Sequence, residues 1–95
     1  MKKAVLEITM KVSSADRAKA GAVYAKYKPS FLTTVPGAES KDLLLREEDV
    51  QVLHGFASRS TAESYLASQL FGVDVVGELK PYLAAAPDIR IYERQ

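Results

Sequence analysis

Residues 50–71 read VQVLHGFASRSTAESYLASQLF, and this run joins a strand-forming segment to a helix-forming one. The first eight residues are largely apolar on both sides of the predicted strand: Val50, Val52, His54 and Phe56 alternate with Gln51, Leu53, Gly55 and Ala57. A central strand that is covered on both faces has this pattern. Ser60 and Glu63 then have the spacing of a capping box, which predicts the start of a helix.

The flanking segments supply three more strands. Residues 4–12 alternate between an apolar and a mixed side, as a strand does. Residues 41–46 precede the 50–57 strand across a polar turn, so the two predict a hairpin. Residues 88–93, after Pro87, predict the last strand.

Two helical regions lie between these strands. Ala20, Tyr24, Tyr27 and Phe31 form a stripe with helical spacing. Pro29 lies inside that stripe and predicts a kink or the start of a second short helix. The second helix is expected to run from residue 60 to about residue 71, to break at Gly72, and to be followed by a short helix capped by Asp74.

The resulting order is β-α-β-β-α-β, the split βαβ pattern. We therefore predict one domain, residues 1–95, of the α+β class with ferredoxin-like topology and a four-stranded antiparallel sheet. Both helices lie on one face in this topology, so the other face is open. Because residues 41–46 and 50–57 are apolar on both sides, and exposed apolar patches mark interfaces, we predict a homodimer.

Composition excludes several classes of protein. Among 95 residues, 13 Lys and Arg balance 12 Asp and Glu, so the basic excess of a nucleic-acid-binding protein is missing and no nucleic-acid partner is predicted. There is no Cys, which excludes thiolate chemistry and fits a reducing compartment. No apolar run approaches the roughly 20 residues of a membrane span, and no signal peptide is recognisable, so we predict a cytoplasmic protein without a membrane partner.

The sequence also lacks familiar catalytic motifs. Neither a phosphate-binding glycine loop nor a zinc-binding His/Cys cluster is present. RNA-recognition domains share the predicted topology but stack bases on aromatic residues of a basic third strand, and the third strand here has one aromatic and no basic residue. No metal site is predicted.

His54 is the candidate catalytic residue. A histidine titrates near neutral pH, so it suits a pocket acid or base; alternatively, His54 is a neutral core residue with one hydrogen bond. Tyr24, Tyr27, Phe31 and Phe56 are the candidate ligand-binding residues, with ordinary packing of a helix on a sheet as the alternative. Glu7, Arg90 and Tyr92 lie on strands, where a cross-strand pair or contact with water is the simpler interpretation.

The segments VQVLHGFAS (residues 50–58) and AESYLAS (residues 62–68), followed by Phe71, resemble the dimeric α+β barrel superfamily. The similarity is greatest to antibiotic-biosynthesis-monooxygenase-like domains, including heme-degrading monooxygenases. This resemblance implies a homodimer whose two sheets close into a barrel, with a pocket between sheet and helices in each subunit. Phe56 falls where the monooxygenases often have Trp. The heme-ligating His of some members has no counterpart in residues 72–76, so no cofactor and no tight heme binding are predicted.

Two functions follow from this resemblance. The first is a small-molecule-binding domain that acts as a cofactor-independent, monooxygenase-like enzyme on an apolar or aromatic compound. The second is a non-catalytic ligand-binding or stress-associated dimer. An enclosed pocket containing His54 favours the first function, whereas an interior filled by Tyr24, Phe31 and Phe56 favours the second.

Overall fold

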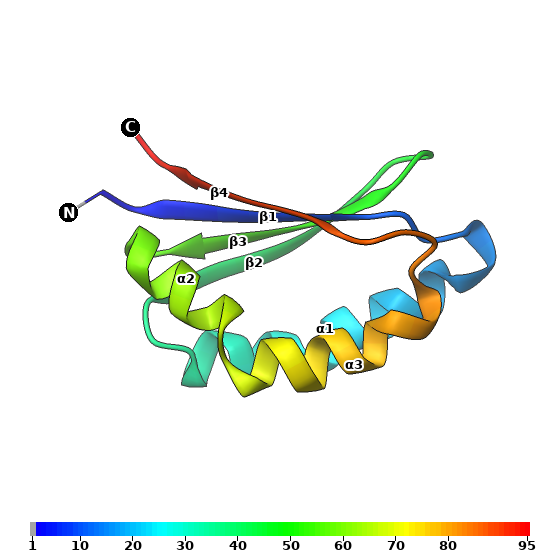
Figure 1. Ribbon diagram of the computed structural model, residues 1–95, viewed down its shortest axis with the longest axis horizontal. Helices are drawn as coiled ribbons and strands as arrows, with labels where there is room; N and C mark the ends of the chain where they lie inside the picture. The colour runs from blue at the N-terminus through cyan, green and yellow to red at the C-terminus, as the bar shows by residue number, and fades with distance from the viewer. Residues whose placement is uncertain (1) are drawn as a thin grey trace.

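The computed structural model describes residues 2–95, which form a sheet covered by helices on one face (Figure 1). The antiparallel sheet has the order β2-β3-β1-β4, with β1 Ala4–Met10, β2 Ala38–Leu45, β3 Val50–Phe56 and β4 Asp88–Glu93. The central position predicted for the strand at residues 50–57 is thereby confirmed, and β2 lies at one edge. The predicted bounds of the last strand are also confirmed.

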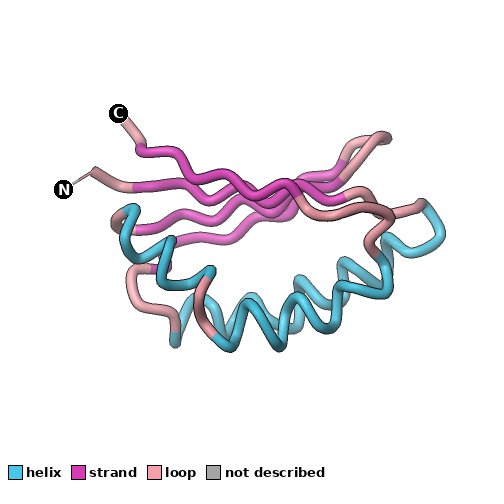
Figure 2. Tube along the Cα trace, viewed as in Figure 1, coloured by secondary structure: helices cyan, strands magenta, loops and turns pink. Residues whose placement is uncertain are grey.

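The helices form a single layer beneath the sheet (Figure 2). A 3-10 turn, η1 Ser14–Asp16, leads into α1 Arg17–Thr34, and α2 Arg59–Leu66 follows β3. A π-helical turn, η2 Leu70–Val75, continues into α3 Val76–Leu79 and the 3-10 turn η3 Lys80–Tyr82. The chain therefore has the β-α-β-β-α-β, ferredoxin-like arrangement of the α+β class that its sequence predicts.

The helix at Pro29 differs from the sequence prediction. α1 continues through Pro29 to Thr34, and no second helix starts there. Pro29 removes one helical hydrogen bond, but Phe31, two residues later, is 0% exposed and holds this turn against the sheet. The Thr33 hydroxyl also donates to the Pro29 carbonyl over 2.8 Å.

The cap of α2 differs as well. The N-cap is Ser58, not Ser60, because Ser58 is the last residue with an extended backbone (φ −158°, ψ 162°) and Ser60 is already helical. The Ser58 hydroxyl accepts from the Thr61 N–H, and the Thr61 hydroxyl accepts from the Ser58 N–H, each over 3.3 Å. The capping box is therefore formed by Ser58 and Thr61.

Gly72 does not break the second helical region. That region is interrupted earlier, after Leu66, and the π-helical turn then passes through Gly72 and Asp74 into α3. Phe71 and Val75, at 7% exposure each, anchor the turn in the core on both sides of Gly72. Burial of these side chains outweighs the low helix propensity of glycine.

One row of paired residues crosses the sheet on the face that the helices cover. Lys41 pairs with His54, His54 with Leu6, and Leu6 with Ile91. Directly opposed residues of paired strands share a face, so this row faces the helical layer.

The opposite face of the sheet carries no helix (Figure 1). Leu44 and Tyr92 on this face are 47% and 48% exposed, whereas Val5, which pairs with Tyr92, is 9% exposed. Polar side chains also lie here, and Gln51 donates to the Thr9 hydroxyl over 3.0 Å. Within residues 2–95, no helix has the length and apolar character needed to cross a membrane.

Candidate functional site

A cavity lies between the sheet and the helical layer. Its volume is about 60 Å³, measured as the space open to the centre of a water-sized sphere. Most of its wall is aliphatic or aromatic, with contributions from Ile8, Tyr24, Leu43, Val52, Val75 and Leu79. Two ionisable side chains of the sheet, Lys41 and His54, also line it.

Aromatic rings close one end of this cavity. The ring cluster consists of Phe31, His54, Phe56, Tyr65 and Phe71. The Phe31 ring meets His54 at 5.3 Å, Phe56 at 5.5 Å and Tyr65 at 5.1 Å between centroids, each time edge to face. Such contacts add stability beyond the area that they bury, so this end of the interior is rigidly packed.

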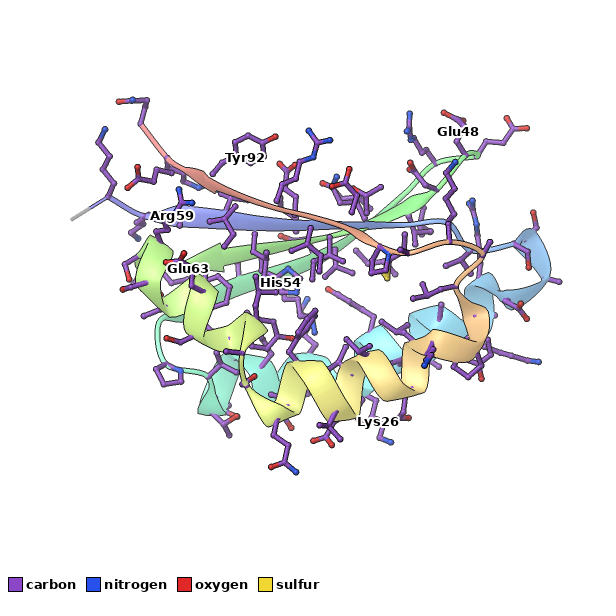
Figure 3. All side chains as sticks on the ribbon, in the orientation of Figure 1. Lys26, Glu48, His54, Arg59, Glu63 and Tyr92 are labelled. Atoms are coloured by element: carbon purple, nitrogen blue, oxygen red, sulfur yellow. The ribbon has the colours of Figure 1, made fainter. Side chains whose placement is uncertain are left out.

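His54 lies at the boundary between the ring cluster and the cavity (Figure 3). It is 2% exposed, and its Nδ1 lies 3.1 Å from the Leu6 carbonyl oxygen. A carbonyl only accepts, so Nδ1 carries the hydrogen and Nε2 carries the lone pair. Burial, with a smaller effect of the Lys41 charge, lowers the pKa of His54 to about 4, although hydrogen bonds to the Leu6 and Val52 backbone act to raise it. The imidazole is therefore neutral at pH 7.

Lys41 is a site residue that the sequence analysis did not single out. It is 4% exposed, and its Nζ lies 5.2 Å from the Phe31 ring centroid and 5.7 Å from that of Tyr24. Among residues 2–95, no carboxylate forms an ion pair with this ammonium group. Burial lowers the pKa of Lys41 to about 8, with a smaller effect of the Lys28 charge. The sequence feature that could have identified it is the alternation along β2, which places Lys41 on the same side of the strand as Leu43 and Leu45.

The two tyrosines of the predicted stripe have separate environments. Tyr24 lines the cavity, and its hydroxyl donates to the Lys41 carbonyl oxygen over 2.7 Å, which holds α1 against β2. The Tyr27 hydroxyl instead donates to the Glu78 carboxylate, which also pairs with Lys26 on the outer side of the helices. Of the two tyrosines, only Tyr24 belongs to the cavity wall.

Phe31 and Phe56 are completely buried at 0% exposure. Both belong to the ring cluster behind His54, and neither lines the cavity. Glu7, Arg90 and Tyr92 lie on the opposite face of the sheet, where Tyr92 points away from the helices in Figure 3. The structure therefore brings His54, Lys41 and Tyr24 to one cavity.

The mouth of the cavity lies beside the turn between β2 and β3. Leu45, on the wall there, is 65% exposed, so the cavity reaches the surface at this point. Arg17 crosses the mouth, and its guanidinium donates to the carbonyl oxygens of Arg46 at 2.6 Å and Glu47 at 2.7 Å. This clamp ties the start of α1 to the hairpin.

The chemistry available is that of an apolar chamber with one neutral imidazole and one ammonium group. Such a chamber excludes water, and a low dielectric strengthens any charge interaction inside it. The described residues contain no group of three His, Asp or Glu side chains arranged as a metal site. The site is thus suited to binding and proton transfer with a small organic molecule.

Comparison with known proteins relates this geometry to solved structures. No protein-family model and no curated protein matches the chain. A putative antibiotic biosynthesis monooxygenase from Bordetella bronchiseptica superposes with a TM-score of 0.87 at 12% identity, covering 100% of this chain and 99% of that one. Its counterpart from Caulobacter crescentus gives 0.85 at 21% identity, covering 99% and 91%.

A further similar structure is SnoaB, a cofactor-independent oxygenase from Streptomyces nogalater. It superposes with a TM-score of 0.79 at 14% identity, covering 100% of this chain and 95% of that one. At these identities the likeness concerns the fold. The chain has the fold of the antibiotic biosynthesis monooxygenase-like proteins, as the resemblance of residues 50–71 implied.

Proposed function

We propose that this protein binds a small apolar aromatic compound in the cavity and acts on it as a cofactor-independent, monooxygenase-like enzyme. The observation that carries the proposal is His54: a neutral imidazole on the wall of an apolar chamber, with Nδ1 fixed by the Leu6 carbonyl. This arrangement leaves Nε2 as the proton acceptor. The fold shared with a cofactor-independent oxygenase supports the same assignment.

His54 takes a proton only when an anion forms beside it. An imidazolium next to the Lys41 ammonium is unfavourable in an apolar site. A ligand with an acidic phenol or enol resolves this conflict, because its oxyanion lies between the two cations. The ligand therefore has to be acidic, and the proton moves from its hydroxyl to Nε2.

Oxygenation then needs only the deprotonated ligand and O₂. The anion gives one electron to O₂, and the two radicals combine into a peroxide that takes back the proton. Loss of water from this hydroperoxide leaves a ketone, so that one oxygen atom ends in the product and one in water. The role of this chain is to bind the ligand, accept its proton and keep water out.

The test uses His54→Ala and His54→Gln with a screen of small phenols and quinones. We expect both variants to keep the fold while ligand binding or oxygen consumption is lost. Tyr27→Phe, outside the cavity, is the control and should retain both. Clear destabilisation of both His54 variants, by roughly 1–3 kcal/mol, with no ligand found for the parent protein would make His54 a structural residue.

A non-catalytic ligand-binding or stress-associated dimer is the second candidate. It is favoured by the ring cluster, in which Phe31 and Phe56 themselves fill part of the interior. Oxygen uptake separates the two functions. Binding of a phenol without oxygen uptake, at any pH from 6 to 9, would favour the second.

The oligomeric state proposed is a homodimer, formed through the face of the sheet that lacks helices. The exposed Leu44 and Tyr92 on that face support this proposal. Leu44→Asp should shift sedimentation equilibrium toward the monomer, whereas Leu32→Asp, on exposed α1 surface, should not. A wild-type monomer at micromolar concentration would contradict the proposal. We also propose that the protein is cytoplasmic, in keeping with the absence of Cys.

A further inference from the structure

Lys41 is the most unusual charge in this structure, because nothing among residues 2–95 balances it. Its side chain is 4% exposed, and no carboxylate pairs with Nζ in the described chain. Nζ itself keeps some accessible surface, since no fully buried side-chain nitrogen among the described residues lacks a partner. A buried ammonium group is ordinarily paired or hydrogen-bonded, since its removal from water is costly. Here it has only the faces of Phe31 and Tyr24.

The surroundings of Lys41 are also positive or neutral on every side. His54 faces it from β3 as a neutral ring, while Tyr24 and Lys28 face it from α1. The cavity wall contains no Asp or Glu, and its other cation, Arg17, is bonded to backbone carbonyls at the mouth. The chamber therefore offers an anion one free ammonium group and no competing carboxylate.

We infer that the cavity takes a small carboxylic acid with an apolar, ring-sized body, whose carboxylate accepts from Lys41. The inference rests on the proposed function and extends its ligand class from phenols and enols to carboxylic acids, which also place an oxyanion beside Lys41. A carboxylate supplies the acceptor oxygens that the ammonium group lacks, and charge-assisted hydrogen bonds of this kind are strong in a desolvated site.

The size of the cavity sets the size of the acid. A water occupies roughly 10–15 Å³ on the same measure, so a cavity of about 60 Å³ has space for about four to six water-sized groups. That is the scale of one substituted ring. The aliphatic residues Leu43, Val52 and Val75 would contact this ring, and a strongly hydrated phosphate dianion would not suit them.

Three isosteric compounds test the charge: benzoate, neutral benzamide and cationic benzamidine, titrated by calorimetry. Benzoate should bind the wild-type protein about tenfold more tightly than benzamide, since charged partners strengthen a hydrogen bond. Benzamidine should not bind. In Lys41→Met the preference for benzoate should disappear, whereas Lys19→Met, the same charge change on exposed α1 surface, should retain it.

Two further measurements do not depend on a variant's ligand affinity. Without ligand, Lys41→Met should raise the unfolding temperature, because an uncompensated charge leaves the core. In the wild type, benzoate affinity should fall as pH rises through about 8, where free Lys41 loses its proton, while benzamide affinity stays constant. A benzoate affinity that is unchanged between pH 7 and pH 10 would overturn the inference.

The remaining outcomes separate this inference from the proposed function. If benzamide binds as tightly as benzoate, the cavity binds small molecules but Lys41 does not select their charge, and only the inference fails. If benzoate affinity survives in Lys41→Met, the same conclusion holds. If none of the three compounds binds at millimolar concentration but a phenol does, the inference fails and the proposed function stands; if no phenol binds either, both fail.

Discussion

The interior between the sheet and the helices has two ends that are packed in different ways. At one end, the ring cluster fills the space: Phe31 meets Phe56 and Tyr65 edge to face, and Phe56 and Tyr65 meet at a tilt. At the other end, short aliphatic side chains such as Val52 and Val75 line a cavity. Stability is thus concentrated at one end and room for a ligand at the other. His54, Tyr65 and Phe71 belong to both ends, since they join the ring cluster and also line the cavity, so the two roles meet at these residues.

The largest effect is expected at the ring cluster. Phe31→Ala should lower the free energy of unfolding by about 3–5 kcal/mol, because the rings of His54, Phe56 and Tyr65 lose a shared partner and a cavity forms. Denaturant unfolding measures this loss. Leu32→Ala, its neighbour at 38% exposure, is the control and should cost clearly less. Equal losses in the two variants would remove the distinction between the two ends.

The next largest effect is expected at His54, between the ring cluster and the cavity, where the free energy of unfolding should depend on pH. The folded-state pKa of His54 is lowered from 6.5 to about 4, so the unfolded chain binds the proton more tightly. The contribution of neutral His54 to the free energy of unfolding is therefore fully present above pH 6.5. It is lost as the pH falls toward 4, by about 3 kcal/mol for a pKa shift of this size. His54 is the one His of the protein, so His54→Gln removes this titration. Urea unfolding of the variant should therefore show a smaller loss of stability at acid pH than the wild type. Identical acid profiles would contradict a desolvated His54.

A smaller effect of opposite sign is expected at the cavity end. Gly21 lies inside α1 on the cavity wall, and a Cβ there would meet nothing within 4 Å. Gly21→Ala should therefore stabilise the protein by roughly 0.5–1 kcal/mol through helix propensity. Gly77→Ala, with equally open space on exposed α3, is the matched control for propensity alone. Destabilisation by Gly21→Ala in thermal melts would show that this end is filled.

No effect is expected from hemin. Val75 and Val76 line the cavity where the resemblance places an axial His in heme-degrading members, and a valine side chain has no ligand atom. Hemin titration followed by absorbance should give no saturable complex. A one-to-one complex with a histidine-ligated spectrum would mean that His54 leaves the Leu6 carbonyl to bind iron.

Much of the fold followed from sequence periodicity. The alternation in residues 4–12 and 50–57 predicts β1 and β3 with their buried faces, because a strand that packs one face against helices needs apolar residues at alternate positions. The bounds and interruptions of the helices were harder to predict from the sequence. Pro29 and Gly72 are residues that disfavour helices locally, but burial of Phe31 and Phe71 beside them overrides that preference. Local propensity alone does not contain this tertiary contribution.

The candidate site could be predicted from the sequence only in part. His54 stood out because it is the single His in an apolar strand, and the structure places it on the cavity wall. Lys41 did not stand out, since a lysine near the start of an edge strand is usually solvated. Its burial depends on α1, whose Tyr24 hydroxyl reaches the Lys41 carbonyl from 17 positions earlier in the chain. Which aromatic residues line the cavity and which fill the core likewise depends on this docking.

The π-helical turn at residues 70–75 contains one residue more than an α-helical turn in the same place would need. A π-helical turn closes its hydrogen bonds over one more residue than an α-helical turn, so deleting one residue there would restore α-helical spacing. Because such a deletion removes only the extra residue of the turn, the helical segments on either side would keep their register, and Val76 and Leu79 would still face the cavity. The turn is therefore a place where evolution or a protein engineer can remove one residue of the helical layer without turning α3 away from the cavity.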